Sequence, residues 1–450
     1  METIRLKKLI VGGIGILLVL FILCPSSADA APEKISLKVW SFGARLAELW
    51  KNYAPDFEKL HPNVSISVTR LPSGPMMDKL QICFRTGVGA PDIADVEPCG
   101  RFLAGPLDKL PLLDLTSYVE KENLVERCLK GTWERGSYKG RYFYAPWDET
   151  ATVLIYRRDI FEEAGFPSEP EEVEKFLATW DDYIKAGKKI TKDIDGDGKI
   201  DRYMMMADYK TSWAGSREFQ TVFTQRGGSW FDKEGQQLVD SRTMIDAVRF
   251  YVDLLNKHKI VMDIGADVKA GVRFTAMNKD EVATAIVWGW YAAWVKDYTP
   301  ALEEKWGAVL IPAVKPEGRR TGAWPGPGVA CIIKQSKHPD IAWKYMNFCM
   351  FNKENLLRRY REGWWFSLPP VTEVLKDPMY SKYDPYWKQR FGAKMVESMI
   401  KEDLPIQYHS PYMKPAWEYV GAAINEVAYG GKTPEEAIKD AADKLRTLMR

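Results

Sequence analysis

One short loop carries acidic residues at the spacing of a calcium site. Its carboxylates are Asp193, Asp195, Asp197 and Asp201. Alternate positions place carboxylates on one concave side of a loop, and the carbonyl of Lys199 can supply a further oxygen ligand. An EF-hand loop has a bidentate Glu at its twelfth position, where this chain has Met204. The loop therefore predicts a structural Ca²⁺ site without a catalytic role, and a solvated acidic turn is the alternative.

The spacings that metal or nucleophilic catalysis requires are missing from the sequence. The four histidines are far apart, and no H-E-x-x-H, C-x-x-C or G-x-S-x-G motif occurs. Paired carboxylates alone can hydrolyse a glycosidic bond, so a secreted glycan-active enzyme is the alternative from another functional class. We predict that the chain is not an enzyme, has no catalytic residue and requires no cofactor.

Aromatic side chains are abundant, with 17 Trp and 21 Tyr in 450 residues. A buried indole needs a partner for its N–H, so Trp is a demanding residue to use only as core filling. Sugars present apolar C–H faces ringed by hydroxyls, and a site for them combines flat aromatic rings with a few polar side chains. The composition favours a sugar ligand, and packing in a large core is the other use of these rings.

The elements that must position these rings begin with a strand–helix–strand pattern. Apolar residues alternate at 35–40 and 64–68, recur at helical spacing at 46–60 and 76–85, and form a short run at 91–96. This order predicts an α/β fold with a parallel sheet between helices. Ligands bind such sheets at the carboxyl ends of the strands. The residues at those ends are Trp40, Ser41, Phe42, Glu97 and Arg101.

Two helix starts are also visible in the sequence. Thr179 precedes an acidic residue three positions on, and Thr433-Pro434-Glu435-Glu436 forms a capping box with Pro at the first helical position. Both threonines are therefore predicted to cap helices.

The first thirty residues have the pattern of a secretory signal peptide. A basic start is followed by an apolar run from Leu9 to Leu23, too short for a membrane span, and by the cleavage pattern Ala28-Asp29-Ala30. Cys24 ends the apolar run as a lipoprotein cysteine would, although Leu23 occupies a position where a small residue is expected. We predict a periplasmic or extracellular protein, with lipid anchoring at Cys24 as the alternative.

Length and charge narrow the class further. A chain of 450 residues exceeds what one core usually organises, so two lobes are expected. The formal net charge of +2 gives no indication of a nucleic-acid partner. Five cysteines follow the predicted signal peptide, so at most two disulfides can form within the mature chain and their pairing stays open: Cys83, Cys99, Cys128, Cys331 and Cys349.

Short motifs follow one another in a fixed order from residue 35 to the end. They include LKVWSFG, FEKLHPNVSISV, GAPDIADV, YKGRYFYAPWDETATVLIYRRDIFEEAGF, DEVATAIVWGW, WGAVLIP and KTPEEAIKDAADKL. In these motifs the chain resembles the type 1 extracellular solute-binding proteins of bacterial ABC importers, the group that includes the maltodextrin-binding protein. The resemblance implies a two-lobed periplasmic-binding-protein fold (type II) that traps a ligand by hinge closure and delivers it to permease subunits.

The resemblance also implies where the chain passes between the lobes. The crossings are expected at Asp148–Tyr156, near Trp306–Pro312 and around Asn352–Leu356. One lobe then comprises residues 35–147 and 313–352, and the other comprises 148–312 and 353–450. Every cysteine after the signal peptide falls in the first lobe, so a disulfide there would brace that lobe and leave the hinge free.

The same resemblance assigns ligand contacts to side chains at the crossings and strand ends. To Trp40, Phe42, Glu97 and Arg101 it adds Trp147, Asp148, Asp208, Tyr209, Trp213, Trp288, Trp290, Trp324, Trp365 and Trp417. After Ile93 the chain lacks the aromatic residue and acid of the maltodextrin-binding protein and has Glu97, Pro98 and Cys99 instead. The resemblance therefore implies a monomeric sugar or oligosaccharide binder without specifying the sugar. A polyol, a phosphorylated polyol or a peptide is the alternative ligand.

Overall fold

The computed structural model describes residues 33–96, 107–149, 151–210, 217–265, 271–322, 328–363, 367–401 and 406–450. Residues Ile35–Arg450 form one unit built on two five-stranded sheets. The first sheet has the order β2-β1-β3-β12-β6, with β1 Ile35–Ser41, β2 Val64–Arg70, β3 Ile93–Val96, β6 Ala145–Pro146 and β12 Val329–Ile332. The second has the order β11-β7-β10-β8-β9, with β7 Thr152–Arg157, β8 Tyr203–Ala207, β9 Val261–Asp263, β10 Val282–Trp288 and β11 Trp306–Val309. A hairpin of β4 Ser137–Tyr138 and β5 Arg141–Tyr142 completes the strands of the described residues.

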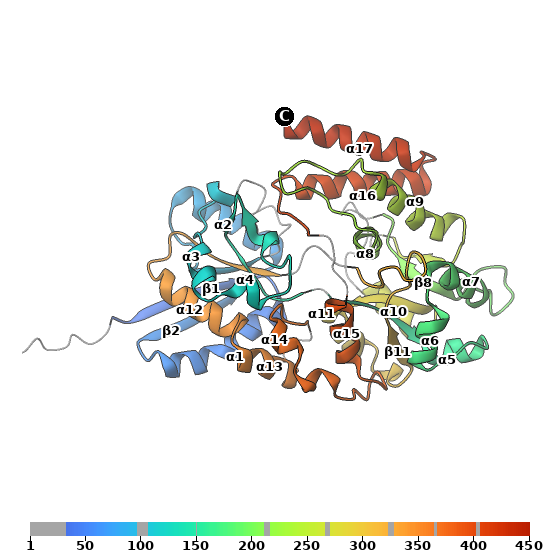
Figure 1. Cartoon of the computed structure of the whole chain (residues 1–450), viewed down its shortest axis with the longest axis horizontal. Helices are drawn as coiled ribbons and strands as arrows, with labels where there is room; N and C mark the ends of the chain where they lie inside the picture. The colour runs from blue at the N-terminus through green and yellow to red at the C-terminus, as the bar shows by residue number, and fades with distance from the viewer. Residues whose placement is uncertain are drawn as a thin grey trace, which may run out of the picture. The chain divides into compact units, whose positions relative to one another are not determined.

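The helices cover the sheets along the whole chain (Figure 1). Up to β12 they are α1 Ala44–Leu60, α2 Ser73–Thr86, α3 Thr116–Lys121, α4 Leu124–Arg127, α5 Arg158–Glu163, α6 Pro170–Phe176, α7 Trp180–Ile190, α8 Arg217–Gln225, α9 Arg242–Asn256, α10 Gly271–Asn278 and α11 Gly289–Tyr298. After it come α12 Pro339–Met350, α13 Lys353–Arg361, α14 Thr372–Leu375, α15 Phe391–Ile400, α16 Met413–Tyr429 and α17 Pro434–Met449. Short 3₁₀ turns lie at Leu107–Lys109, Glu134–Gly136, Pro300–Leu302 and Pro378–Ser381.

The predicted strand–helix–strand start is confirmed. β1 pairs in parallel with β2 from Ile35 opposite Val64, and with β3 from Val39 opposite Ile93. Helices α1 and α2 connect these strands, and α1 packs on β1 and β2. Because all three strands run in parallel, Ser41 at the end of β1 and Asp95 near the end of β3 lie together at one edge of the sheet.

Burial explains why the central strands read as continuous apolar runs. Every residue of β3, β7, β10, β11 and β12 is buried, because helices or loops cover both faces of each sheet. In β1 the faces differ: Leu37 and Val39 join one hydrophobic cluster, and Trp40 joins a second with Met76 and Leu80 of α2. The period-two alternation of β1 therefore separates two packed layers.

The chain passes from one sheet to the other at several points. β6 belongs to the first sheet and β7 to the second, and the next change lies between β11 and β12. At the third predicted crossing, the chain contacts α1. The Tyr53 hydroxyl of α1 donates to the carbonyl of Asn355 over 2.8 Å, and Arg358 pairs with Asp56 at 2.6 Å. α13 thus continues the packing of α12 on α1, and the lobe boundaries themselves stay a prediction.

Local signals in the sequence are reproduced at the helix ends. The Thr179 side chain accepts a hydrogen bond from the Asp182 N–H at the start of α7, and Thr433 and Glu436 form the predicted capping box of α17. The described cysteines, Cys83, Cys128, Cys331 and Cys349, are buried free thiols. Among the described residues no helix has the length and apolarity needed to cross a membrane.

Candidate functional site

A buried polar cluster lies where β1 and β3 end. The Ser41 hydroxyl donates to Oδ2 of Asp95 over 2.6 Å, and Asp95 is fully buried. Burial raises the pKa of Asp95 from 3.8 to about 8, against the opposing effects of Ser41 and of the Trp50 and Trp147 indoles, while the nearby charge of Asp148 raises it further. The structure thus brings the predicted residues Trp147 and Asp148 beside a carboxyl that our sequence analysis missed, although an acid inside a buried strand is itself a signal.

A buried arginine donates a hydrogen bond to the backbone at the first predicted crossing. Trp147 is fully buried and meets Trp50 edge-on, with ring centroids 4.7 Å apart. Arg359 of α13, also fully buried, donates from one terminal nitrogen to the Trp147 carbonyl over 3.3 Å. Asp148 is 2% exposed. In this structure Trp147 and Asp148 therefore serve as interior residues of the crossing, and their contact with a ligand stays a prediction.

The other two described residues at the first sheet's edge differ in exposure. Trp40 is 6% exposed, and the Lys79 ammonium lies 4.4 Å from its ring centroid. Phe42 is half-buried and packs against both hydrophobic clusters. Phe42 thus keeps part of its ring accessible at this edge.

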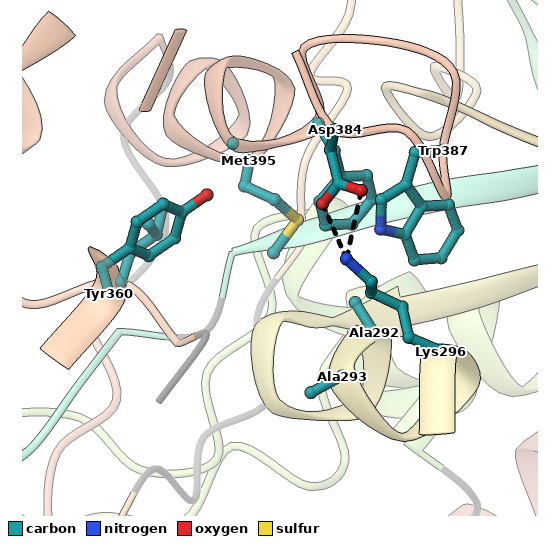
Figure 2. A pocket seen from close by; sticks show the side chains of 10 residues that line it. Ala292, Ala293, Lys296, Tyr360, Asp384, Trp387 and Met395 are labelled. Carbon is teal, nitrogen blue, oxygen red and sulfur yellow. Dashed lines mark hydrogen bonds and ion pairs between the residues drawn. The ribbon is translucent and has the colours of Figure 1, made fainter. Parts of the chain in front are cut away.

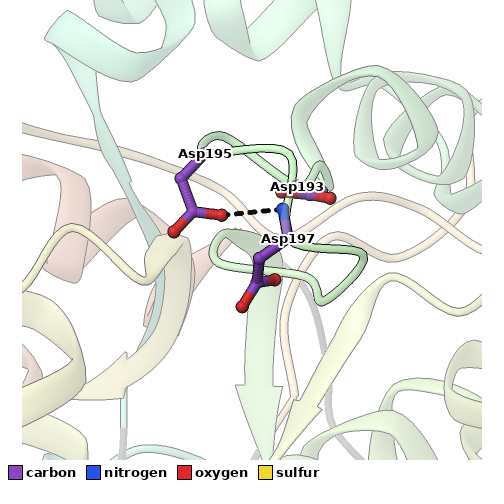
Figure 3. Close-up of side chains that lie close together, drawn as sticks. All are labelled: Asp193, Asp195 and Asp197. Carbon is purple, nitrogen blue, oxygen red and sulfur yellow. Dashed lines mark hydrogen bonds between the residues drawn. The ribbon is translucent and has the colours of Figure 1, made fainter.

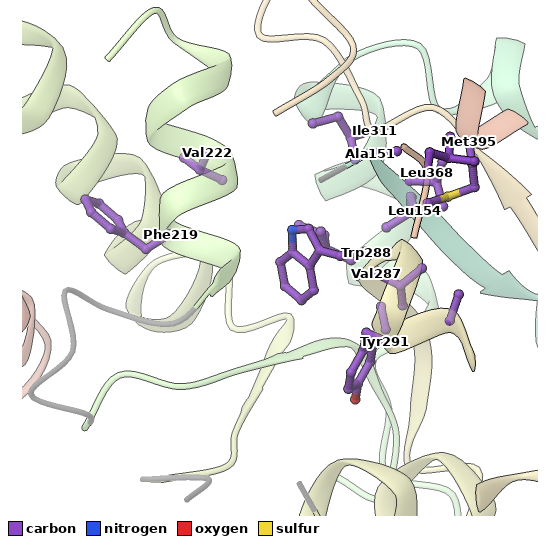
Figure 4. Packing of buried hydrophobic residues seen from close by; sticks show 14 of the residues in the cluster. Ala151, Leu154, Phe219, Val222, Val287, Trp288, Tyr291, Ile311, Leu368 and Met395 are labelled. Carbon is purple, nitrogen blue, oxygen red and sulfur yellow. The ribbon is translucent and has the colours of Figure 1, made fainter. Parts of the chain in front are cut away.

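At the end of β10 one tryptophan is buried and the other is half-buried. Trp288 is 1% exposed and packs among the residues shown in Figure 4, which include Phe219 and Val222 of α8. The Trp290 ring lies nearly parallel to that of Trp288, with centroids 6.1 Å apart, and meets Trp294 edge-on at 5.0 Å. The Arg217 guanidinium lies 4.9 Å from the Trp290 ring centroid. Sequence reasoning missed Trp294 and Arg217, although a tryptophan four positions after Trp290 on a helix is a detectable signal.

The predicted residues after β8 and in α16 are interior. Asp208 is 3% exposed, and its Oδ1 accepts the Lys210 N–H over 2.9 Å. Tyr209 stacks on Tyr251 with centroids 4.4 Å apart and donates its hydroxyl to the Tyr251 carbonyl. Trp417 is 1% exposed, with its ring centroid 6.1 Å from that of Trp230. Ligand contact by these three residues stays a prediction, as it does for those outside the described residues: Glu97, Arg101, Trp213, Trp324 and Trp365.

A small pocket, partly open to solvent, lies between α11, α13 and α15 (Figure 2). The Lys296 ammonium binds both carboxylate oxygens of Asp384 there, at 3.0 and 3.1 Å. Trp387 and Met395 line the same space. Among the residues that the structure describes, none of the predicted ligand residues lines this pocket.

The acidic loop gathers three of its four carboxylates (Figure 3). One oxygen each from Asp193, Asp195 and Asp197 lies within 4.8 Å of the others. The Asp193 oxygens accept the N–H groups of Gly196 and Gly198, both at 2.7 Å. These hydrogen bonds close the loop so that the carboxylates converge.

Asp201 and Lys199 have other contacts in this loop. Asp201 Oδ2 accepts the N–H of Ile194 at 2.7 Å and that of Asp195 at 3.3 Å. The Lys199 ammonium lies 3.3 Å from Asp197 Oδ2. The donor set is therefore all oxygen and fits Ca²⁺ in type, while the lysine ammonium competes for one of the carboxylates.

Comparison with known proteins links the whole fold to one family. The family model described as "Bacterial extracellular solute-binding protein" matches residues 43–355, more than half of the chain. The arabinooligosaccharide-binding protein of Bacillus subtilis (strain 168) is 26% identical over 460 residues, covering 98% of this chain and 100% of that protein. The arabinooligosaccharide-binding protein of Halalkalibacterium halodurans is 25% identical, covering 91% of this chain and 89% of that protein.

Among solved structures, the maltose-bound MalE3 protein of T. maritima superposes with a TM-score of 0.69 at 23% identity. The match covers 92% of this chain and 100% of that one. It shows the same two-lobed α/β fold.

Proposed function

Because the chain belongs to the bacterial extracellular solute-binding proteins, we propose that it binds an oligosaccharide outside the cytoplasm and delivers it to the permease subunits of an ABC importer. The observation that carries this proposal is the match, over 98% of this chain, to an arabinooligosaccharide-binding protein. An arabinooligosaccharide is accordingly the first ligand to test. The half-buried rings of Trp290 and Phe42 supply the aromatic surface that such a ligand requires.

The proposed mechanism is closure of the two sheet-based lobes on the ligand. Closure needs few moving residues when lobes are joined by short crossings, and ligand stabilises the closed form by its higher affinity for that form. Here the first change of sheet takes only the residues between Pro146 and Thr152. The chain acts as a binder in this proposal, so a bound oligosaccharide is released intact.

We also propose that the protein is exported. The signal peptide is cleaved after Ala30, and the mature protein is a periplasmic or extracellular monomer, with Cys24 removed together with the leader. N-terminal sequencing of the secreted protein distinguishes this cleavage from lipid anchoring at Cys24. Size-exclusion chromatography with light scattering checks the monomer.

The function is tested by thermal unfolding of residues 31–450 in the presence of arabinotriose, maltotriose, galactobiose, ribitol and a tripeptide. Ligand at about one hundred times its Kd stabilises the folded state by roughly 2.7 kcal/mol, which gives a measurable rise in Tm. A rise with an oligosaccharide that chromatography recovers intact supports the proposal. A rise only with ribitol or the peptide, or recovery of a cleaved sugar, contradicts it.

We also propose that the loop 193–201 binds Ca²⁺ as a structural ion. The three converging carboxylates support this, and no step of ligand binding depends on it. The test is calcium titration by calorimetry on the wild type and on Asp195→Asn, which removes one charged ligand. Loss of binding in the variant supports the site, whereas equal heats from both proteins contradict it.

A further inference from the structure

Trp290 differs in its exposure from the other tryptophans of the predicted site that the structure describes. Trp147, Trp288 and Trp417 are at most 1% exposed, whereas Trp290 is half-buried. Its ring is nearly parallel to Trp288, at an interplanar angle of 12°, and meets Trp294 at 78°. A sugar can reach only an exposed part of a ring, so the orientation of Trp290 decides which part that is.

The contact with Arg217 bears directly on that orientation. The guanidinium carbon lies 4.9 Å from the Trp290 ring centroid, within the range in which a cation is attracted to an aromatic face. A planar guanidinium stacks on an indole, which an ammonium cannot do. The contact therefore depends on the orientation of the guanidinium as well as on its charge. An arginine over one face also excludes ligand from that part of the ring.

A buried ion pair lies next to Arg217 in the chain. Arg217 is the first residue of α8, and its neighbour Glu218 binds Arg273 of α10, with one of the two contacts at 3.3 Å. The side chains of Glu218 and Arg273 are 2% and 5% exposed. Burying two charges is a costly way to join two helices, and we infer that this pair fixes one arrangement of α8 on α10. Here the fixed element is the start of α8 and therefore the position of Arg217.

We propose that Arg217 is a positioning residue for Trp290: its guanidinium holds the indole so that the exposed part of the ring accepts one sugar face. The inference rests on the proposed function for its ligand, and on the geometry of α8, α10 and α11 for its mechanism. Arg217 acts through Trp290 rather than by recognising the sugar itself.

The first test needs no ligand. The protein is labelled with 5-fluorotryptophan, and the ¹⁹F resonance of Trp290 is assigned by its loss in Trp290→Phe. Arg217→Gln is expected to shift this resonance, and Arg217→Lys, which keeps the charge without the planar group, to shift it less. The matched control is Arg226→Gln, because Arg226 follows α8 at its other end and lies over Phe250 at 4.1 Å. An unchanged Trp290 resonance in Arg217→Gln, or an equal shift in Arg226→Gln, overturns the proposal.

The second test is a double-mutant cycle of affinity for arabinotriose by calorimetry. Arg217→Gln is expected to weaken binding about threefold to tenfold, as loss of one cation–π contact predicts. In the Trp290→Phe background the same substitution should cause no further loss, and additive losses overturn the proposal. If the wild type binds none of the oligosaccharides, the proposed function fails, and the fluorine experiment still decides whether Arg217 orients Trp290. Circular dichroism confirms that each variant is folded.

Discussion

At the residue scale, Asp95 of β3 is an ionisable group whose pKa is strongly altered by its surroundings. Its carboxyl is fully buried and accepts the Ser41 hydroxyl, and burial raises its pKa to about 8. The indoles of Trp50 and Trp147 favour the charged form, and the charge of Asp148 opposes it. A protonated carboxyl in a buried strand avoids placing an isolated charge in the core, which would be expensive.

Asp95 therefore makes the free energy of unfolding depend on pH. Because its pKa is raised in the folded state, folded protein keeps a proton that unfolded protein releases above about pH 4. We expect the stability to fall as pH rises from 5 to 8, by at most about 1.4 kcal/mol per pH unit from this one group. Asp95→Asn should remove that fall. Urea unfolding at several pH values measures it.

Asp182→Asn is the control for the Asp95 prediction. The hydrogen bond from the Thr179 side chain lowers the pKa of Asp182 below its ordinary value, so this group titrates under more acidic conditions. Its removal should leave the slope between pH 5 and 8 unchanged. A wild-type slope retained in Asp95→Asn would show that Asp95 is not the titrating group.

At the element scale, α8 joins the core to the Trp290 region. Its residues Phe219 and Val222 pack in the buried cluster around Trp288 (Figure 4), while Glu218 binds Arg273 of α10. The apolar face gives this helix its burial, and the ion pair gives it one position against α10. A short helix of nine residues has little stability of its own, so both sets of contacts are needed to hold it.

Removing one member of the buried pair should be strongly destabilising. Glu218→Gln breaks the buried ion pair with Arg273 by removing the charge of one member, and we expect a loss of about 3–5 kcal/mol in the free energy of unfolding. Replacing both residues by Met should recover most of that loss, since no charge is then buried. Guanidinium chloride unfolding measures the free energy of unfolding of the single and double variants. Equal losses in the two would contradict the role of the buried ion pair.

At the scale of the whole molecule, one charged contact joins helices that pack beside different sheets. Arg45 of α1 pairs with Asp297 of α11. Helix α1 packs on the first sheet and α11 follows β10 of the second. Arg45 lies near the amino end of its helix and Asp297 near the carboxyl end of its own, where each charge is disfavoured by the helix dipole. The attraction between the two charges therefore offsets part of the unfavourable interaction of each with its helix dipole.

The Arg45–Asp297 pair should be weak and sensitive to salt. Its side chains are 32% and 47% exposed, so we expect a coupling free energy of at most about 1 kcal/mol. It should disappear near 1 M NaCl, where the screening length is about 3 Å. A double-mutant cycle with Arg45→Gln and Asp297→Asn, at low and high salt, measures the coupling. The control cycle uses Arg249 and Glu435, an exposed pair joining α9 to α17. A coupling that is independent of salt would contradict this account.

The sequence by itself determined the family, the α/β class, the parallel strands β1–β3 and the caps at Thr179 and Thr433. These features depend on local periodicity and on side chains that bond to backbone a few residues away. It also identified the acidic loop, whose residues are neighbours in the chain.

Only the tertiary structure decided which of the predicted aromatic residues are accessible. Trp288 and Trp290 are the same type of residue and lie two positions apart in the sequence, yet one is buried and the other is half-buried. Trp290 also contacts Arg217 of α8, about seventy residues earlier in the chain. The partnership of Asp95 with Ser41, of Arg217 with Trp290 and of Arg359 with the Trp147 carbonyl likewise joins distant segments. Such contacts leave no periodic signal, because only the folded chain brings their members together.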